Sequence, residues 1–75
     1  MSKNGQYDLG IFLSSREAEI LLLIGDGLPN KGIAERLGIT AKAVEFHKTR
    51  LYAKIGVTNA VGAVRFAIRE GYMDA

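Results

Sequence analysis

The sequence feature that most constrains the fold is a three-residue turn, Gly38-Ile39-Thr40, between two amphipathic runs. Gly38 suits the left-handed conformation that ends many helices, because it has no Cβ atom. Thr40 offers a side-chain oxygen that can cap the first turn of a following helix. The turn therefore predicts one helix over residues 31–37 and a second over residues 41–55. Two helices joined by a short turn that contains glycine form a helix-turn-helix.

Capping residues predict two further helices, one on each side of this pair. Ser14 and Glu17 have the spacing of a capping box, in which each side chain binds the backbone of the other residue. This box predicts a first helix that runs to about Asp26. Asn59 is a good N-cap for a fourth helix, which is expected to end near Glu70, where a glycine follows.

The start of the second helix contains two residues with specific expectations. Asn30 is predicted to cap this helix, after Gly27 and Pro29 have ended the preceding one. Gly32 lies inside the helix, where glycine costs on the order of 1 kcal/mol relative to alanine. Tight packing or the close approach of a ligand would explain a glycine there.

Length and composition limit the chain to one small helical domain. Its 75 residues hold a single core, and 48% hydrophobic with 24% charged residues indicate a globular chain. The absence of cysteine and the single histidine exclude disulfides, thiolate metal sites and histidine clusters. No apolar run approaches the roughly 18 residues of a membrane span, and the polar start lacks a signal peptide, so we expect a cytoplasmic protein. The predicted fold class is an all-α four-helix bundle over residues 13–75, preceded by a flexible N-terminal arm over residues 1–12.

Helical periodicity assigns one side of each helix to the core. In the first helix, Leu22 falls on the side away from the buried stripe. The predicted core positions of the third helix are Val44, His47, Leu51 and Ile55. The predicted inward positions of the fourth helix are Ala60, Ala63, Val64 and Ala67. The positions left on its outer side, which suit association with another helix, are Val61, Gly62, Arg65, Phe66 and Arg69.

The third helix has an outward face that is unusual for a surface exposed only to water. Its members combine cations, a carboxylate, a hydroxyl and an aromatic ring: Lys42, Glu45, Phe46, Thr49, Arg50 and Ala53. In the DNA major groove, arginine can pair with guanine, glutamate can accept from cytosine, and phenylalanine or a threonine methyl can contact the thymine methyl. Residues 31–54 carry six cations and two carboxylates, a net charge of +4, whereas residues 1–30 carry −2. This local charge suits a nucleic-acid backbone, with a solvated charged face as the alternative.

Several short motifs lie in one register from residue 13 to residue 57. They are Arg16-Glu17 with Glu19, Gly27, Asn30-Lys31, Ile33-Ala34, Leu37, Val44, His47, and Lys54 with Gly56-Val57. In this combination the chain resembles, over most of its length, the LuxR/GerE-type DNA-binding domain of bacterial transcriptional regulators. The resemblance implies a four-helix bundle whose third helix enters the major groove and whose fourth helix supports dimerisation.

The resemblance also implies roles for individual residues. Those that face the groove are Lys42, Glu45, Phe46 and Thr49. Those suited to contact the DNA backbone are Lys31, His47, Arg50 and Lys54. Those expected at the dimer interface are Val61, Gly62, Arg65 and Phe66. The implied partners are double-stranded DNA with inverted half-sites, a second copy of the chain as a homodimer on DNA, and RNA polymerase.

Two residues depart from the common family pattern. Glu45 stands where many relatives have lysine, and Gly32 stands where glutamate is usual. The first change removes a cation from the reading face, so the preferred DNA sequence does not carry over from relatives with lysine. Glutamate occurs in part of the family, and the DNA-binding interpretation is therefore unaffected.

A protein-binding role is the alternative to DNA binding. A helix-turn-helix module can sequester another regulator without contacting DNA, and exposed Leu22 and Phe66 would allow this. The positive outward face of the third helix favours DNA. Activation and repression fit the sequence equally well, as do a complete small regulator and an excised C-terminal domain.

Catalysis is not expected from this sequence. His47 has no serine or aspartate at a triad spacing, and no cluster of carboxylates offers metal ligands. The glycines at 25 and 27 lack the strand and the lysine of a phosphate-binding loop. We therefore expect a sequence-specific transcriptional regulator with no catalytic residue, no cofactor and no metal.

Overall fold

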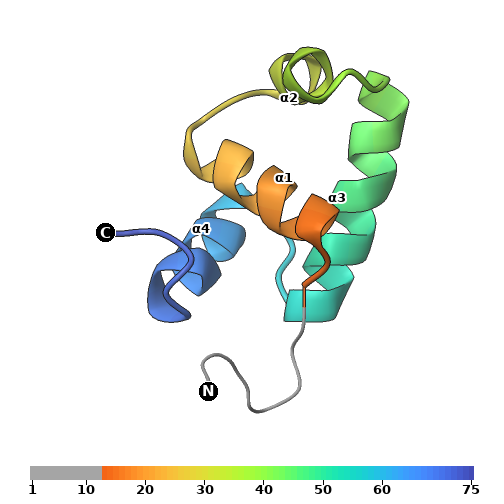
Figure 1. Cartoon of the computed structure of the whole chain (residues 1–75). Coiled ribbons are helices and arrows are strands. Elements are labelled where there is room, and N and C mark those ends of the chain that lie inside the picture. Colours follow the sequence, from red (N-terminus) through yellow and green to blue (C-terminus); the bar gives the residue numbers. More distant parts are fainter. Residues whose placement is uncertain (1–12) are drawn as a thin grey trace.

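The computed structural model describes residues 13–75 and contains four α-helices (Figure 1). They are α1 (Ser15–Gly25), α2 (Asn30–Leu37), α3 (Ala41–Ile55) and α4 (Ala60–Arg69). Both α1 and α3 contact each of the other three helices. The longest helix, α3, lies beside α1, with α2 near its N-terminal end and α4 toward its C-terminal half.

This arrangement confirms the predicted all-α bundle, with α2 and α3 as the helix-turn-helix. The predicted N-terminal arm, residues 1–12, lies outside the described residues. Between residues 13 and 75, none of the helices is long and apolar enough to span a membrane.

Local hydrogen bonds explain where three of the four described helices begin. At α1 the predicted capping box is complete. The Ser14 hydroxyl accepts from the Glu17 N–H at 3.1 Å, and the Glu17 carboxylate accepts from the Ser14 N–H at 2.8 Å. At α3 and α4, Thr40 and Asn59 each accept from the N–H three residues further on, at 3.0 and 2.9 Å. Each cap satisfies a backbone donor that helix geometry leaves free, and each is predicted by the sequence.

The start of α2 differs from the prediction. Asn30, the expected N-cap, is the first residue of the helix, and Pro29 occupies the N-cap position without a side-chain hydrogen bond. Proline suits this position because its ring restricts φ to values near the observed −73° and it has no N–H that needs a partner. The Asn30 side chain binds elsewhere: its Oδ1 accepts a hydrogen bond from Lys48 Nζ at 2.8 Å, which joins α2 to α3.

The turn between α2 and α3 has the predicted conformation. Gly38 lies in the left-handed region at φ 69°, and Ile39 packs half-buried against the core. The structure does not require glycine at position 32, because a Cβ atom on Gly32 would make ordinary van der Waals contacts with Leu28 and Pro29. Tight packing therefore does not explain Gly32, and the close approach of a ligand there stays a prediction.

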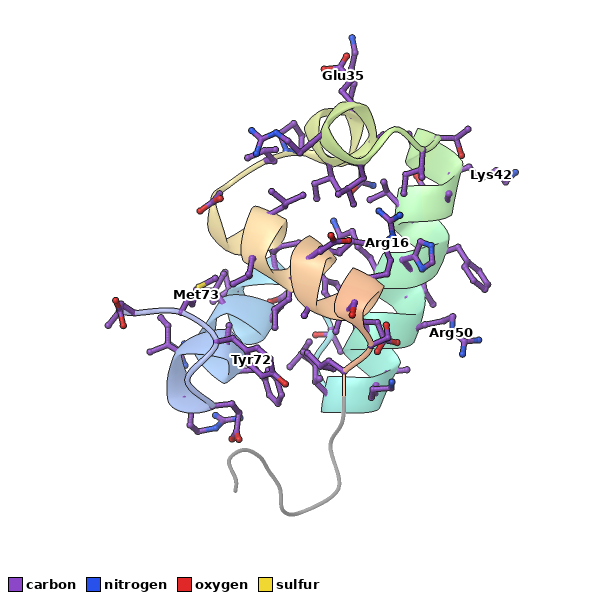
Figure 2. All side chains as sticks on the ribbon, viewed as in Figure 1. Arg16, Glu35, Lys42, Arg50, Tyr72 and Met73 are labelled. Atoms are coloured by element: carbon purple, nitrogen blue, oxygen red, sulfur yellow. The ribbon has the colours of Figure 1, made fainter. Side chains whose placement is uncertain are left out.

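The chain after α4 folds back on the bundle. Gly71 has a φ of 84°, and the N–H of Tyr72 donates to the Ala67 carbonyl at 2.7 Å, which reverses the backbone. Met73 then lies at the C-terminal end of α1 (Figure 2), where its side chain would overlap a Cβ atom at Gly25. This last segment therefore contacts α4 at the Ala67 carbonyl and α1 at Gly25.

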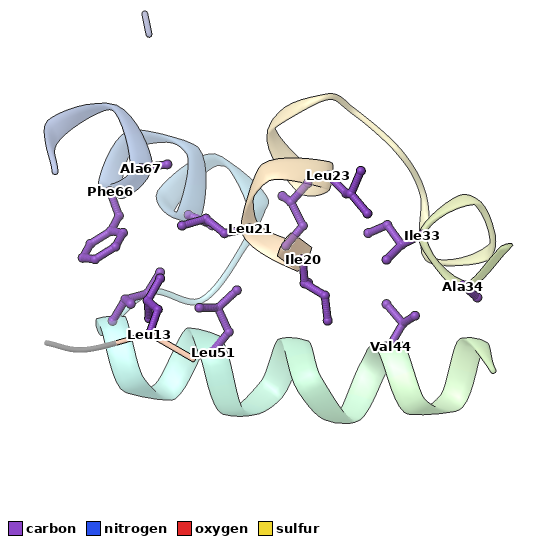
Figure 3. Packing of buried hydrophobic residues seen from close by; sticks show 13 residues of the cluster. Leu13, Ile20, Leu21, Leu23, Ile33, Ala34, Val44, Leu51, Phe66 and Ala67 are labelled. Atoms are coloured by element: carbon purple, nitrogen blue, oxygen red, sulfur yellow. The ribbon is translucent and has the colours of Figure 1, made fainter. Parts of the chain in front are cut away.

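The core contains apolar side chains from all four helices and from Leu13 (Figure 3). Its largest fully buried members are Ile20, Leu21, Ile33, Val44 and Leu51. The predicted inward positions of α3 that are buried are Val44, Leu51 and Ile55. His47, also predicted to face inward, is only half-buried, and Leu22 is exposed as its angular position predicts.

The predicted orientation of α4 is wrong at two positions. Phe66, expected on the outer side, is 2% exposed, and its ring stacks on that of Tyr72 with centroids 6.0 Å apart. Ala60, expected inside, is exposed. Burying phenylalanine removes far more apolar surface from water than burying alanine, so the helix turns its phenylalanine to the core. The exposed outer side carries Val61, Arg65 and Ile68.

Candidate nucleic-acid interface

The four residues predicted to face the groove lie together on the outward face of α3. All four are exposed, and we call them the reading face: Lys42, Glu45, Phe46 and Thr49. Figure 2 shows Lys42 and Arg50 extending from the same side of α3, away from α1. Since the opposite side of α3 is packed in the core, the bundle holds this face in a fixed orientation.

Two neighbouring side chains of α3, those of Arg50 and His47, lie against the Phe46 ring. The Arg50 guanidinium carbon lies 5.6 Å from the centroid of the Phe46 ring, a cation–π distance. The His47 ring meets the Phe46 ring edge-on, with centroids 5.7 Å apart and planes at 69°. The sequence indicates the contact between Phe46 and Arg50 only by their spacing of four residues, because residues i and i+4 share a side of a helix.

The first turn of α2 is tied to α3 by a side-chain hydrogen bond. Lys31 is exposed in this turn. The hydrogen bond from Lys48 to Asn30 joins the two helices, and the Lys48 amine also lies 5.9 Å from the centroid of the Tyr52 ring. Lys48 therefore helps to set the position of Lys31 relative to α3. The sequence contains no sign of this link, because its two partners are 18 residues apart.

Lys54, predicted to contact the DNA backbone, is engaged within the bundle. Its Nζ lies 2.8 Å from Glu17 Oε1 and joins the last turns of α3 to the first turn of α1. The Glu17 side chain is 10% exposed, and a carboxylate that is removed from water needs a partner to stay charged. A phosphate contact by Lys54 would share its ammonium group, which has three donors, with Glu17.

The Glu17 charge makes a testable contribution to stability. Burial raises the pKa of this carboxyl, but the hydrogen bonds from Lys54 and Ser14 and the Lys54 charge outweigh burial, and the pKa lies below its ordinary 4.5. A carboxyl of this kind stabilises the fold above its unfolded pKa and loses that contribution as pH falls through the folded pKa. We expect Glu17→Gln to lower the free energy of unfolding by about 1–2 kcal/mol at pH 7 and by much less at pH 3, measured by urea unfolding.

Glu19→Gln is the matched control for this measurement. The Glu19 carboxylate is exposed and lies 3.6 Å from Arg16, and an exposed ion pair of this kind contributes little. Its removal should change the free energy of unfolding by less than about 0.5 kcal/mol at either pH. An effect of Glu17→Gln that is equal at pH 7 and pH 3 would contradict the role assigned to the charge.

The structure does not bring together all four residues predicted for the dimer interface. Val61 and Arg65 are exposed on the outer side of α4, whereas Phe66 belongs to the core. Gly62 is half-buried, and a Cβ atom there would lie 3.0 Å from the Cβ of Val57, so Gly62 faces the loop before α4. No group of three histidine, aspartate or glutamate side chains in residues 13–75 is placed to hold a metal ion.

Comparison with known proteins identifies relatives of the chain. The family described as bacterial regulatory proteins, luxR family, matches residues 12–67. The transcriptional regulatory protein MctR of Rhizobium johnstonii is 46% identical over 62 residues, and the oxygen regulatory protein NreC of Staphylococcus aureus is 42% identical over 62 residues. Each match covers 83% of this chain but 29% of the relative, so the chain spans less than a third of the length of these regulators. The chain belongs to the LuxR family of bacterial regulatory proteins.

Proposed function

We propose that α3 lies in the major groove of duplex DNA and that the reading face selects the sequence to which the chain binds. The observation that carries this proposal is the exposure of cationic, carboxylate, hydroxyl and aromatic groups on one side of a helix whose other side is packed in the core. Each kind of group has a counterpart among the donors, acceptors and methyl groups that base pairs present in the major groove. Lys42, Glu45, Phe46 and Thr49 would therefore contact base edges.

Cations beside the reading face would contact the DNA backbone. Lys31 and Arg50 are exposed, and His47 is half-buried next to Phe46. Contacts to phosphates add affinity for every sequence, because all base pairs carry the same backbone. Lys54 would join this set while its ammonium group, which has three donors, stays paired with Glu17.

Two copies would bind DNA together through the outer side of α4. Val61 is 66% exposed, and Ile68 is exposed on the same side two helical turns further on, with Arg65 between them. A second helix would remove this apolar pair from water. A single helix in a groove provides a small interface, and a second copy doubles it. We expect the free chain to be monomeric, since this contact is far smaller than a stable dimer interface.

The chain would act by binding rather than by catalysis, in the cytoplasm. Its relatives MctR and NreC are named as regulatory proteins, and the chain matches 29% of each. Contact with RNA polymerase stays a prediction from the family resemblance.

One selection experiment tests both the reading face and the paired copies. Random duplexes bound by the wild type, Glu45→Lys and Val61→Glu are recovered and sequenced. We expect wild-type sites to contain inverted half-sites at one spacing, near one helical turn of DNA or a multiple of it. Glu45→Lys should change the half-site sequence and keep the spacing, because a base contact discriminates by about 1–3 kcal/mol. Val61→Glu should keep the half-site sequence and lose the fixed spacing, because it places a charge in an apolar contact.

Glu35→Lys is the control for the charge change. Glu35 is exposed on α2 and points away from the rest of the bundle (Figure 2), so the same change of charge occurs away from the reading face. Its selected motif should equal that of the wild type. An unchanged motif for Glu45→Lys would remove Glu45 from the reading face, and unpaired wild-type half-sites would show that α4 serves only the core. Failure to recover any duplex would favour the protein-sequestering alternative.

A further inference from the structure

Phe46 is an apolar ring among polar neighbours on the reading face. It is 58% exposed in the second turn of α3. Lys42, Glu45 and Thr49 can each form hydrogen bonds with the edge of a base, but a phenyl ring has neither a donor nor an acceptor. The ring therefore suits a chemical group different from those that its neighbours bind.

The ring is restrained before any DNA is present. The Arg50 guanidinium at 5.6 Å and the edge-on His47 ring at 5.7 Å contact it from two residues of the same helix. An exposed side chain normally loses rotational freedom when it enters an interface, and this loss weakens binding. Because Arg50 and His47 already limit the ring, Phe46 loses less freedom than an isolated exposed phenylalanine would.

The major groove offers one apolar group to such a ring, the 5-methyl group of thymine. We infer that Phe46 recognises a thymine in each half-site by packing against this methyl group, an inference that rests on the proposed placement of α3 in the groove. Thr49 also has a methyl group on the reading face. The Phe46 ring has the larger apolar surface, and Thr49 retains a hydroxyl for the polar groups of the base edges.

Replacing thymine by deoxyuridine tests this inference, because the change removes the methyl group and preserves base pairing. The probe is a duplex selected by the wild-type chain, synthesised with each thymine replaced in turn. For the wild type we expect about fourfold weaker binding at one thymine of the half-site, the factor that corresponds to exposing one buried methyl-sized group. For Phe46→Ala we expect the thymine and deoxyuridine duplexes to bind equally at that position.

The measurement is a competition between equal amounts of the two duplexes, which reports their affinity ratio even for a variant that binds weakly. Circular dichroism of Phe46→Ala should match the wild type, since the ring lies outside the core. Thr49→Ser is the matched control, because it removes only the threonine methyl group and should retain the fourfold ratio.

Three results would overturn the inference. They are a wild-type site without any deoxyuridine-sensitive position, a fourfold ratio that persists in Phe46→Ala, and a ratio that disappears in Thr49→Ser. Failure of the wild type to bind any duplex is a different result, since it would overturn the proposed placement of α3 and with it the basis of this inference.

Discussion

Phe66→Ala is expected to lower the free energy of unfolding by about 3–5 kcal/mol, the range for removing a phenylalanine side chain from a packed core. The ring is 2% exposed, points into the core from α4 (Figure 3) and stacks on Tyr72. Its removal leaves a cavity that the short helix α4 can close only in part. The total stability of a domain of this size is roughly 3–9 kcal/mol, so the expected loss is a large share of it. Urea unfolding followed by circular dichroism measures the change.

Val61→Ala is the control for this substitution. Val61 lies on the same helix but is 66% exposed, and truncating an exposed side chain should change stability by less than about 0.5 kcal/mol. If Phe66→Ala reduced stability by less than 1 kcal/mol, the ring would be on the outer side of α4, as the helical periodicity predicts.

DNA binding by the wild type is expected to weaken strongly with salt. The exposed cations proposed to contact the DNA backbone include Lys31 and Arg50. Each phosphate that a protein neutralises releases counterions, and the slope of log K against log salt is about −0.9 per phosphate. Three or four phosphate contacts for each copy correspond to an affinity loss of roughly 40-fold to 150-fold between 50 and 200 mM salt. Titrations of a labelled duplex at several salt concentrations measure the slope.

Two alanine variants distinguish the loss of a phosphate contact from the loss of a positive charge elsewhere on the chain. Lys31→Ala should weaken binding to all sequences alike and reduce the slope by about one unit, because it removes a phosphate contact. Arg69→Ala removes the same charge from α4, where Arg69 is exposed and lies 3.6 Å from Glu70, and should leave the slope unchanged. A wild-type affinity that does not depend on salt would be incompatible with backbone contacts by these cations.

The points where most of the helices begin and end can be predicted from the sequence alone. The caps at Ser14, Thr40 and Asn59 join residues three apart, and Gly38 adopts its left-handed conformation for reasons of local geometry. Such interactions depend on neighbours in the chain and therefore appear in the sequence as fixed spacings. The division of α3 into a core side and the reading face can also be predicted from the sequence. The spacing of the apolar residues of α3 is compatible with only one buried side of the helix.

The orientation of α4 and the partners of Asn30 and Lys54 depend on how the helices pack together. The small apolar residues of α4 allow more than one inward stripe, and packing against α1 selected the one that buries Phe66. The links from Lys48 to Asn30 and from Lys54 to Glu17 join residues 18 and 37 apart in the chain. A polar side chain forms such a contact only when packed helices bring a partner within hydrogen-bond distance, and that distance depends on the packing of the whole bundle rather than on local spacing.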